Sequence, residues 1–197
     1  MKTKDIDFLY EVGTLRHVPR VWSQFGGIDF ANVAEHTFRV MWISAILAKM
    51  EGVDVGKVIK MALVHDISET RTGDVHYLSR MYTDRNETSA INDSFSDTTL
   101  YSEFTELFKE MHDLKSIEAK IVKDADIIDC DFELVEQLWN GNKLSEELVK
   151  VRHLAHKKLQ TNAAKQLIKE FLKHSPHDWH TKGVNRATAG DWAVKKE

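Results

Sequence analysis

Residues 32–50, NVAEHTFRVMWISAILAKM, carry the clearest helix signal in the chain. Their apolar residues recur at three- and four-residue spacing, which is the period of one buried helix face. Asn32 precedes this run and Glu35 follows three positions later, the pattern of a capping pair. We expect a helix from Val33 to about Met50, with His36 on its inward stripe. The apolar members of that stripe are Val40, Ile43 and Leu47.

The same periodicity covers most of the rest of the chain, while the alternation typical of strands is absent. One further helix is expected to open near Asp54 and to continue through His65 to the Thr72-Gly73-Asp74 turn. A long helix is expected from Lys115 to about Trp139, and a last one from Ser145 to about Lys173. The expected inward stripe of the long helix is Ile121, Ala125, Ile128, Phe132, Val135 and Trp139.

Two segments do not fit this helical pattern. Residues 82–99 are polar and turn-rich, which predicts a mobile loop or lid. Residues 176–197 show no period but contain two tryptophans, so we expect part of this tail to dock on the body or on a partner subunit. The predicted organisation is one all-α helical domain over residues 1–175, with 176–197 as an extension of that domain or a subunit contact.

Composition excludes several classes of protein. The chain has 197 residues, 42% of them hydrophobic, which suffices for a sizeable core. Its net charge of -4 provides no overall attraction for polymeric nucleic acid. The single cysteine, Cys130, cannot form an intrachain disulfide, and the N-terminus lacks the apolar core of a signal peptide. The longest apolar stretch, VMWISAILA, is too short to cross a bilayer. We therefore expect a cytoplasmic protein without a membrane span.

Histidines and acidic residues suggest the chemistry. His65 and Asp66 are adjacent at the end of an apolar helix, and Glu69 follows at i+4 and i+3, on the same helical surface. A lone histidine such as His36 is more often a hydrogen-bonded core residue than a ligand. Together with a late Asp126, however, the set supplies two imidazoles and two carboxylates. Such a set can hold a divalent metal and leave positions for water and a phosphate, which indicates a metal-assisted hydrolase.

Five motifs follow one another along the chain: Pro19-Arg20-Val21-Trp22, Asn32-Val33-Ala34-Glu35-His36, His65-Asp66-Ile67-Ser68-Glu69, Thr72-Gly73-Asp74 and Val122-Lys123-Asp124-Ala125-Asp126. In this order, over about Leu15 to Gly141, they resemble the 5′-deoxynucleotidase branch of the HD-domain phosphohydrolase superfamily. The resemblance implies an all-α HD-domain bundle, a cytoplasmic homodimer that does not bind a membrane, and hydrolysis of deoxyribonucleoside 5′-monophosphates.

The resemblance also implies roles for individual residues. It makes His36, His65, Asp66 and Asp126 the ligands of one divalent ion of the Mn, Co, Fe or Zn class. It makes Glu69 the catalytic carboxylate that orients or deprotonates the attacking water. Asp74 takes a catalytic and sugar-contacting position. Arg20 and Trp22 form the substrate-recognition pair, with the guanidinium on the phosphate and the indole against the sugar.

Several alternatives stay open at this point. Periodicity favours Asp124 over Asp126 as the inward residue, and a helix buried on more than one side would reconcile the two. If they have no functional role, Asp124, Asp129 and Asp131 are expected to form a solvated acidic surface. The chain departs from the family pattern at Val75-His76, which bears on substrate preference. Other functions compatible with the motifs are hydrolysis of an alarmone or a nucleoside triphosphate, and a non-catalytic protein stabilised by the metal.

Overall fold

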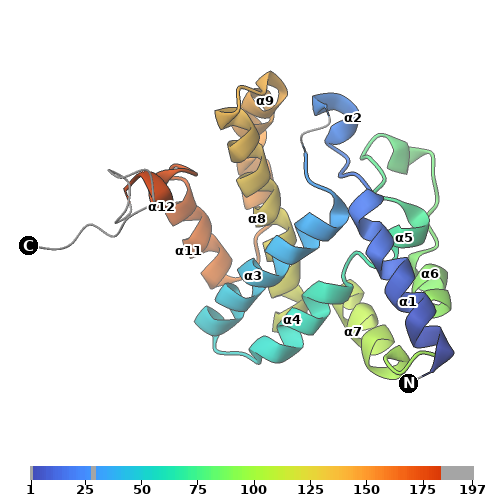
Figure 1. Ribbon diagram of the computed structural model, residues 1–197. Coiled ribbons are helices and arrows are strands. Elements are labelled where there is room, and N and C mark those ends of the chain that lie inside the picture. Colours follow the sequence, from blue (N-terminus) through green and yellow to red (C-terminus); the bar gives the residue numbers. More distant parts are fainter. Residues whose placement is uncertain (1, 28–29, 183–197) are drawn as a thin grey trace, which may run out of the picture.

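The computed structural model describes residues 2–27 and 30–182, and within these ranges it contains helices and turns but no β-strand (Figure 1). The prediction of an all-α fold is therefore confirmed. The elements are α1 Thr3–Gly13, η1 Thr14–His17, α2 Ser23–Gly26, α3 Val33–Glu51, α4 Val55–Val64, α5 Glu69–Thr72, η2 Ser79–Met81, α6 Glu87–Phe95, α7 Tyr101–Asp113, α8 Ile117–Trp139, α9 Lys143–Val151, α10 His153–His156, α11 Asn162–Phe171 and α12 Asp178–Thr181.

The centre of the fold is formed by α3, α4 and α8. Helix α3 packs against both α4 and α8, α7 closes against α4 and α8, and α11 covers another part of α3 and α8. Burial of apolar side chains between these helices is the main source of stability. Fully buried examples are Val40, Leu47, Met61, Ala125 and Ile128. The packing fixes the positions of α3, α4 and α8 relative to one another, and hence of the polar residues that they carry.

The start of α3 is held on two sides. The Asn32 side chain accepts a hydrogen bond from the Glu35 amide, and the Glu35 carboxylate accepts one from the Asn32 amide, so the predicted capping pair is confirmed. A short antiparallel bridge joins Pro19 to Asn32, and the Arg20 amide donates to the Ala31 carbonyl at 3.2 Å. This bridge places the segment that carries Arg20 beside the first turn of α3.

The helix expected from Asp54 through Glu69 is interrupted. Helix α4 ends at Val64, residues 65–68 form a turn, and α5 begins at Glu69. The turn uses short-range bonds, including the Glu69 amide to the Asp66 carbonyl, and the His65 ring donates to the Ala62 carbonyl at 2.7 Å. A side chain bonded to a carbonyl of the preceding turn competes with continued helix. His65 and Glu69 therefore do not lie on one regular helix, as their i+4 spacing had suggested.

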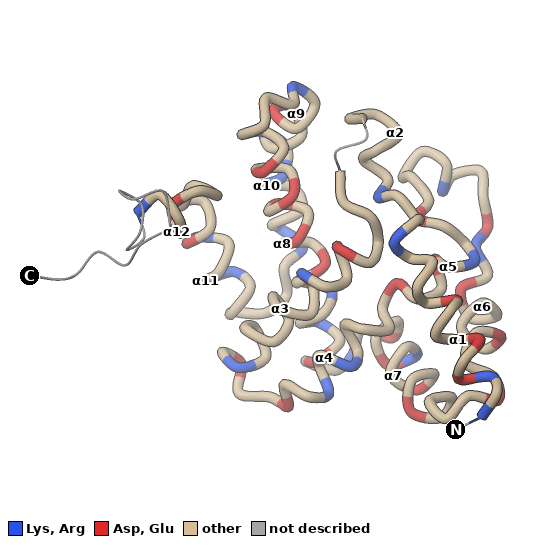
Figure 2. Tube along the Cα trace, viewed as in Figure 1, with Lys and Arg blue, Asp and Glu red and all other residues tan. Residues whose placement is uncertain are grey.

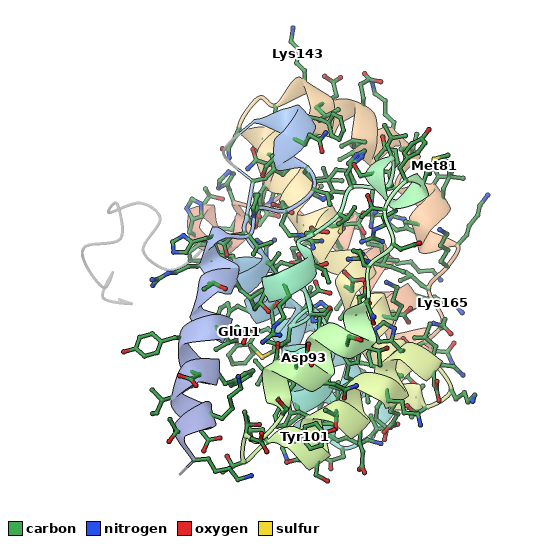
Figure 3. The ribbon with its side chains drawn as sticks, turned by 90° about the vertical axis from the view of Figure 1, so that its right-hand side faces the viewer. Glu11, Met81, Asp93, Tyr101, Lys143 and Lys165 are labelled. Atoms are coloured by element: carbon green, nitrogen blue, oxygen red, sulfur yellow. The ribbon has the colours of Figure 1, made fainter. Side chains whose placement is uncertain are left out.

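The loop expected over residues 82–99 is largely wrong, because α6 occupies Glu87–Phe95. Asn86 caps this helix by accepting from the Ser89 amide, and Ile91 and Phe95 are buried in the core. The helix also binds α1: Ser94 donates to Glu11, whose carboxylate accepts two hydrogen bonds from Arg71. Figure 3 shows Glu11 on α1 next to α6, which carries Asp93. Long-range contacts thus stabilise a segment whose composition resembles a loop.

The single helix expected from Ser145 to Lys173 is also wrong. The structure has α9, α10 and α11 in this range, with a break at residues 157–161. At the break, the Asp124 carboxylate accepts hydrogen bonds from the Gln160 and Thr161 amides and from the Thr161 hydroxyl. The Thr161 hydroxyl then caps α11 by accepting from the Ala164 amide. A partner distant in sequence thus stops one helix and starts the next.

The C-terminal part of the fold departs from prediction at Trp139, which was expected to face inward but is 57% exposed. Within the described part of the tail, the His177 ring contacts that of Trp139 on the body, while Trp179 is 81% exposed. Residues 183–197, which include the second tryptophan of the tail, lie outside the described residues. Charges of both signs are spread over the helices (Figure 2). None of the helices described combines the length and apolar character of a bilayer span.

Candidate metal centre

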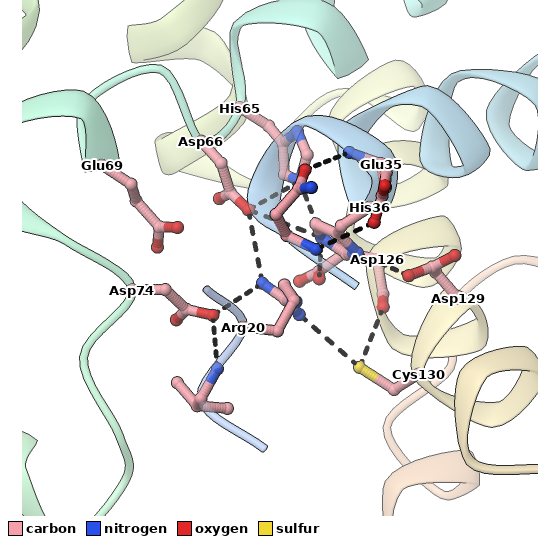
Figure 4. Close-up of polar contacts among 12 residues, drawn as sticks. Arg20, Glu35, His36, His65, Asp66, Glu69, Asp74, Asp126, Asp129 and Cys130 are labelled. Carbon is pink, nitrogen blue, oxygen red and sulfur yellow. Dashed lines mark hydrogen bonds and ion pairs between the residues drawn. The ribbon is translucent and has the colours of Figure 1, made fainter. Parts of the chain in front are cut away.

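Four polar side chains from three parts of the fold meet beside the first turn of α3 (Figure 4). His36 comes from α3, His65 and Asp66 from the turn after α4, and Asp126 from α8. The Nε2 atoms of the two histidines are 3.3 Å apart, and His36 Nε2 lies 3.4 Å from Asp126 Oδ1. Ligating atoms of His36, His65 and Asp126 all lie within 4.8 Å of one another, as one bound cation would require.

Asp66 completes the cluster. Its Oδ2 atom lies 3.2 Å from His65 Nε2 and 3.4 Å from His36 Nε2, so it faces the same point as the two imidazoles. The structure therefore brings together all four residues that the sequence suggested as ligands. Two imidazole nitrogens and two carboxylate oxygens form a donor set that suits a first-row transition metal or zinc.

Both imidazoles are held by their other ring nitrogen. His36 Nδ1 donates to Asp129 Oδ2 at 2.5 Å, and His65 Nδ1 donates to the Ala62 carbonyl at 2.7 Å. A proton on Nδ1 leaves the lone pair on Nε2, which is the nitrogen that faces the cluster in both residues. This is the usual arrangement of metal-binding histidines. The orientation of the donors thus fits a bound cation.

The electrostatics of the cluster also favour positive charge. Burial and the nearby Arg20 lower the pKa of His36, but its hydrogen bonds to carboxylates outweigh them and hold that pKa well above its ordinary value. For Asp126, burial acts against ionisation, yet Lys123 and His36 bring the pKa below its usual range. The carboxylates thus stay ionised and attract a cation, whether a proton on His36 or a metal.

The cluster opens into a cavity of about 370 Å³. Among its described lining residues are four arginines and lysines and five aspartates and glutamates, so the lining alone carries no surplus positive charge. A divalent cation in the cluster would reverse that sign and allow an anionic substrate to bind. The charged lining residues are Arg20, Arg80, Arg85, Lys123, Asp66, Glu69, Asp74, Glu87 and Asp126.

Glu69 lies in the wall of this cavity at the start of α5. Its side chain is 5% exposed, its Oε1 lies 3.4 Å from Arg85 Nη1, and its Oε2 is buried without a hydrogen-bond partner. Burial, followed by the negative charges of Asp66 and Asp74, raises the pKa of Glu69 to about 9. A cation in the neighbouring cluster would oppose this rise. An unpartnered buried carboxylate oxygen beside the cluster is suited to hydrogen bonding with a ligand or water.

Arg20, Trp22 and Asp74 lie at another part of the cavity wall. Asp74 Oδ2 accepts a hydrogen bond from Arg20 Nη1 at 3.0 Å and another from the Val21 amide at 3.1 Å. Asp74 therefore holds the segment that carries the other two residues. The indole Nε1 of Trp22 and the Nε of Arg20 are buried without a partner. These two donors could serve a ligand that offers acceptor oxygens.

Sequence reasoning missed three residues at this site. Asp129 was assigned to a solvated surface, yet it orients His36. Arg85 was not considered and Lys123, although part of the last motif, was given no role, yet both line the cavity. A signal for Asp129 existed, because it lies three positions after Asp126 and hence on a neighbouring part of the same helix face. Arg85 gives no local signal, since only the packing of α6 brings its segment to the site.

The prediction of a solvated surface is wrong for Asp124, Asp129 and Asp131, which are all at most 3% exposed. Asp124 holds the turn before α11, and Asp131 pairs with Arg152 at 2.7 Å and with His156 at 3.0 Å. Helix α8 is covered by α3, α4 and α7 on some faces and by α9 and α11 on others. Its acidic residues are therefore buried on more than one side, and only Asp126 and Asp129 reach the cluster.

Comparisons with known proteins agree with this arrangement. The model of the HD domain family matches residues 12–174. The 5′-deoxynucleotidase HDDC2 of Dictyostelium discoideum is 28% identical over 157 residues, which cover 73% of this chain and 80% of that protein. The HDDC2 of Bos taurus is 31% identical over 127 residues, 61% of this chain and 62% of that protein. The chain thus matches less than two thirds of the length of the bovine relative.

Solved structures show the same fold. A conserved hypothetical protein from Pyrococcus furiosus superposes with a TM-score of 0.71 at 29% identity, covering 86% of this chain and 99% of that one. The HD phosphohydrolase DatZ of cyanophage S-2L, solved with dA and one catalytic Zn²⁺ ion, gives a TM-score of 0.52 at 21% identity. Coverage is 83% of this chain and 94% of DatZ, and at this identity the likeness extends to the fold alone.

Proposed function

The chain belongs to the HD-domain family and is a metal-dependent hydrolase, and we propose that it removes phosphate from deoxyribonucleoside 5′-monophosphates. The observation that carries the proposal is the convergence of His36, His65, Asp66 and Asp126 at a cavity that also contains Glu69. Relatives named 5′-deoxynucleotidase support the substrate class.

In this proposal, His36, His65, Asp66 and Asp126 hold one divalent ion. A bound ion of this kind supplies Lewis acidity, which favours hydroxide near neutral pH and stabilises charge on a phosphate. The donor set is compatible with Mn, Co, Fe or Zn, and the choice among them stays open. Asp129 and the Ala62 carbonyl keep the two imidazoles in the tautomer that ligation needs.

The protein's own groups carry the remaining steps. Glu69 orients the attacking water and accepts its proton through the unpartnered Oε2 atom. Arg20, fixed by Asp74, offers its remaining guanidinium donors to the phosphate, and Trp22 packs against the deoxyribose. Asp74 takes part in catalysis through this positioning and through contact with the sugar. The bond between phosphorus and the 5′ oxygen breaks, the leaving 5′ oxygen takes up a proton, and the products are a deoxynucleoside and phosphate.

A monophosphate is favoured over an alarmone or a triphosphate by the charges of the cavity. Arg80 and Arg85 face carboxylates: Arg85 lies between Glu69 and Glu87, and an Arg80 nitrogen lies 3.9 Å from Asp74. The lining therefore contains no surplus of cations for additional phosphates. A purely structural metal is disfavoured because structural sites usually fill every position with protein ligands, whereas this cluster borders a cavity.

The proposal is tested by phosphate release from a panel of ribo- and deoxyribonucleoside 5′-monophosphates and triphosphates with Mn²⁺, Co²⁺ or Zn²⁺. We expect release from deoxyribonucleoside monophosphates, and none from the His65→Ala variant. Trp22→Ala should relax discrimination against ribonucleotides and weaken binding of both classes. Equal wild-type rates on deoxyadenosine and adenosine monophosphates would contradict the sugar selection. The cytoplasmic location and the homodimer remain part of this proposal.

A further inference from the structure

Lys123 stands next to the candidate metal centre, one helical turn before Asp126 on α8. Its Nζ lies 2.8 Å from Asp126 Oδ2, while the other oxygen of the same carboxylate, Oδ1, faces His36 Nε2 at 3.4 Å. A single carboxylate therefore separates the ammonium from the point at which the proposed ligands converge. Any group bound at that point and extending into the cavity would come within reach of Lys123.

The Lys123 ammonium has donors to spare. It carries three N–H groups, and Asp126 accepts one of them. Its side chain lines the cavity and is 45% exposed, so the remaining donors are accessible to a ligand.

Of the three arginines in the cavity lining, Arg80 is 52% exposed and donates its Nε to the Val75 carbonyl, while the other two are less free than Lys123. Arg20 is 7% exposed, with Nη1 bound to Asp74 and Nη2 near the Cys130 sulfur. Arg85 is 16% exposed and lies between Glu69 and Glu87. A phosphate dianion entering the cavity would have to share these guanidinium groups with buried carboxylates, whereas Lys123 offers a compact charge with free donors.

We infer that Lys123 is a phosphate-binding residue of this site, donating one N–H to Asp126 and another to a non-bridging oxygen of the phosphate. The inference rests on the proposed function for the nature of the ligand, a phosphate monoester. It assigns to α8 two roles at positions three residues apart, because Asp126 supplies a metal ligand and Lys123 the charge that neutralises the phosphate. If Lys123 only oriented Asp126, its substitution would change the affinity for the metal and not the affinity for phosphate.

Binding experiments separate these two roles without relying on turnover. The wild type and the Lys123→Met, Lys123→Arg and Lys120→Met variants are prepared with Glu69→Gln in each, so that no ligand is consumed. Each is loaded with Mn²⁺ or Zn²⁺, its metal content is measured, and affinities for inorganic phosphate, deoxyadenosine monophosphate and deoxyadenosine are determined by calorimetry. Lys120, three residues earlier on α8 and outside the cavity lining, provides the matched control.

We expect Lys123→Met to weaken phosphate and nucleotide binding about 10- to 100-fold, the scale of one charge-assisted hydrogen bond. Deoxyadenosine binding and metal content should not change, Lys123→Arg should retain most of the affinity, and Lys120→Met should match the parent. Unchanged phosphate affinity in Lys123→Met would overturn the inference. So would a parallel loss of metal, which would make Lys123 a residue that positions Asp126.

Failure of the proposed function would look different. If the wild type released no phosphate from deoxynucleotides but its phosphate affinity still depended on Lys123, the substrate assignment would be wrong and the inference would stand. If the wild type hydrolysed deoxynucleotides while Lys123→Met bound phosphate normally, only the inference would be rejected.

Discussion

The two nitrogens of His36 show how one residue links the core to the site. Nδ1 points to Asp129 and Nε2 to the cluster, so the ring cannot rotate without breaking a buried hydrogen bond. Asp129 lies three residues after Asp126 on α8, and both acidic residues therefore bear on the same imidazole. One turn of α8 thus supplies both a candidate ligand, Asp126, and the group that orients another, Asp129. Because the His36 ring is already held in place, less side-chain conformational entropy is lost when a metal binds.

The position of Glu69 predicts that its substitution lowers turnover without lowering the binding of metal or nucleotide. Replacing Glu69 by Gln preserves the shape of the side chain but removes its ability to accept a proton. We expect normal metal content and nucleotide binding, with turnover reduced on the order of a hundredfold or more. Metal analysis and phosphate release measure the two effects. Loss of metal in Glu69→Gln would show instead that Glu69 is a ligand.

At the scale of elements, the acidic residues of α8 divide between two faces. Asp126 and Asp129 face α3, whereas Asp124 and Asp131, seven residues apart, face the segment from α10 to the start of α11. Residues seven apart share a helix face, so one face contacts the site and the other fixes the C-terminal helices. This explains why the apolar periodicity favours Asp124: it marks a buried face, though not the one at the cluster.

Paired substitutions on α8 test this division. Asp126→Asn should abolish metal binding and activity with little effect on the folding of the metal-free protein. Asp124→Asn should leave the activity of the folded enzyme near normal, but lower the free energy of unfolding by about 1–3 kcal/mol, because an amide is a weaker and differently arranged acceptor for three donors, two of them in buried hydrogen bonds. Urea unfolding and activity per folded molecule measure both. Loss of metal in Asp124→Asn would contradict the division.

The contact of α1 with α5 and α6 gives a prediction about pH. Hydrogen bonds from Arg71, opposed by partial burial, lower the pKa of Glu11 to about 2. A carboxyl group whose pKa is lowered in the folded state stabilises that state above its unfolded pKa, and this contribution is lost as pH falls toward the folded pKa. The wild type should therefore lose it between about pH 4.5 and pH 2.

Glu11→Gln tests this linkage. At pH 7 the variant should unfold more easily by about 1–2 kcal/mol, since the arginine is partly exposed and solvent weakens the pair. The difference between the variant and the wild type should shrink as pH falls through the same window. A difference that stayed constant with pH would show that packing, rather than ionisation, accounts for the effect. Denaturant titrations at several pH values measure it.

For the fold as a whole, local periodicity and caps were sufficient to predict an all-α structure and the beginning of α3. They could not predict α6 or the break before α11, because Glu11 and Asp124 stabilise these segments from distant parts of the chain. The candidate ligands were found from residue type and order. Arg85 was missed because only the packing of α6 brings it to the cavity, whereas Lys123 stands in the last motif, three residues before Asp126, and was missed because an ammonium group is not a metal ligand.

The proposed metal would join three parts of the molecule, since its ligands come from α3, the turn after α4, and α8. A ligand that binds only the folded state stabilises it by about 4 kcal/mol when present at about a thousand times its dissociation constant. For a chain of this size, 1 kcal/mol corresponds to roughly 2–4 °C in melting temperature, so saturating Mn²⁺ or Zn²⁺ should raise it by roughly 8–16 °C over chelated protein.

Calorimetric melting of chelated and metal-loaded protein measures this rise, and two variants control for it. His65→Ala removes one donor and should abolish most of the metal-dependent increment. Asp124→Asn lies outside the cluster, so it should melt at a lower temperature in both states yet keep the same increment. An increment that survived in His65→Ala would mean that the cation binds elsewhere on the protein, and that the convergence of the four side chains has another cause.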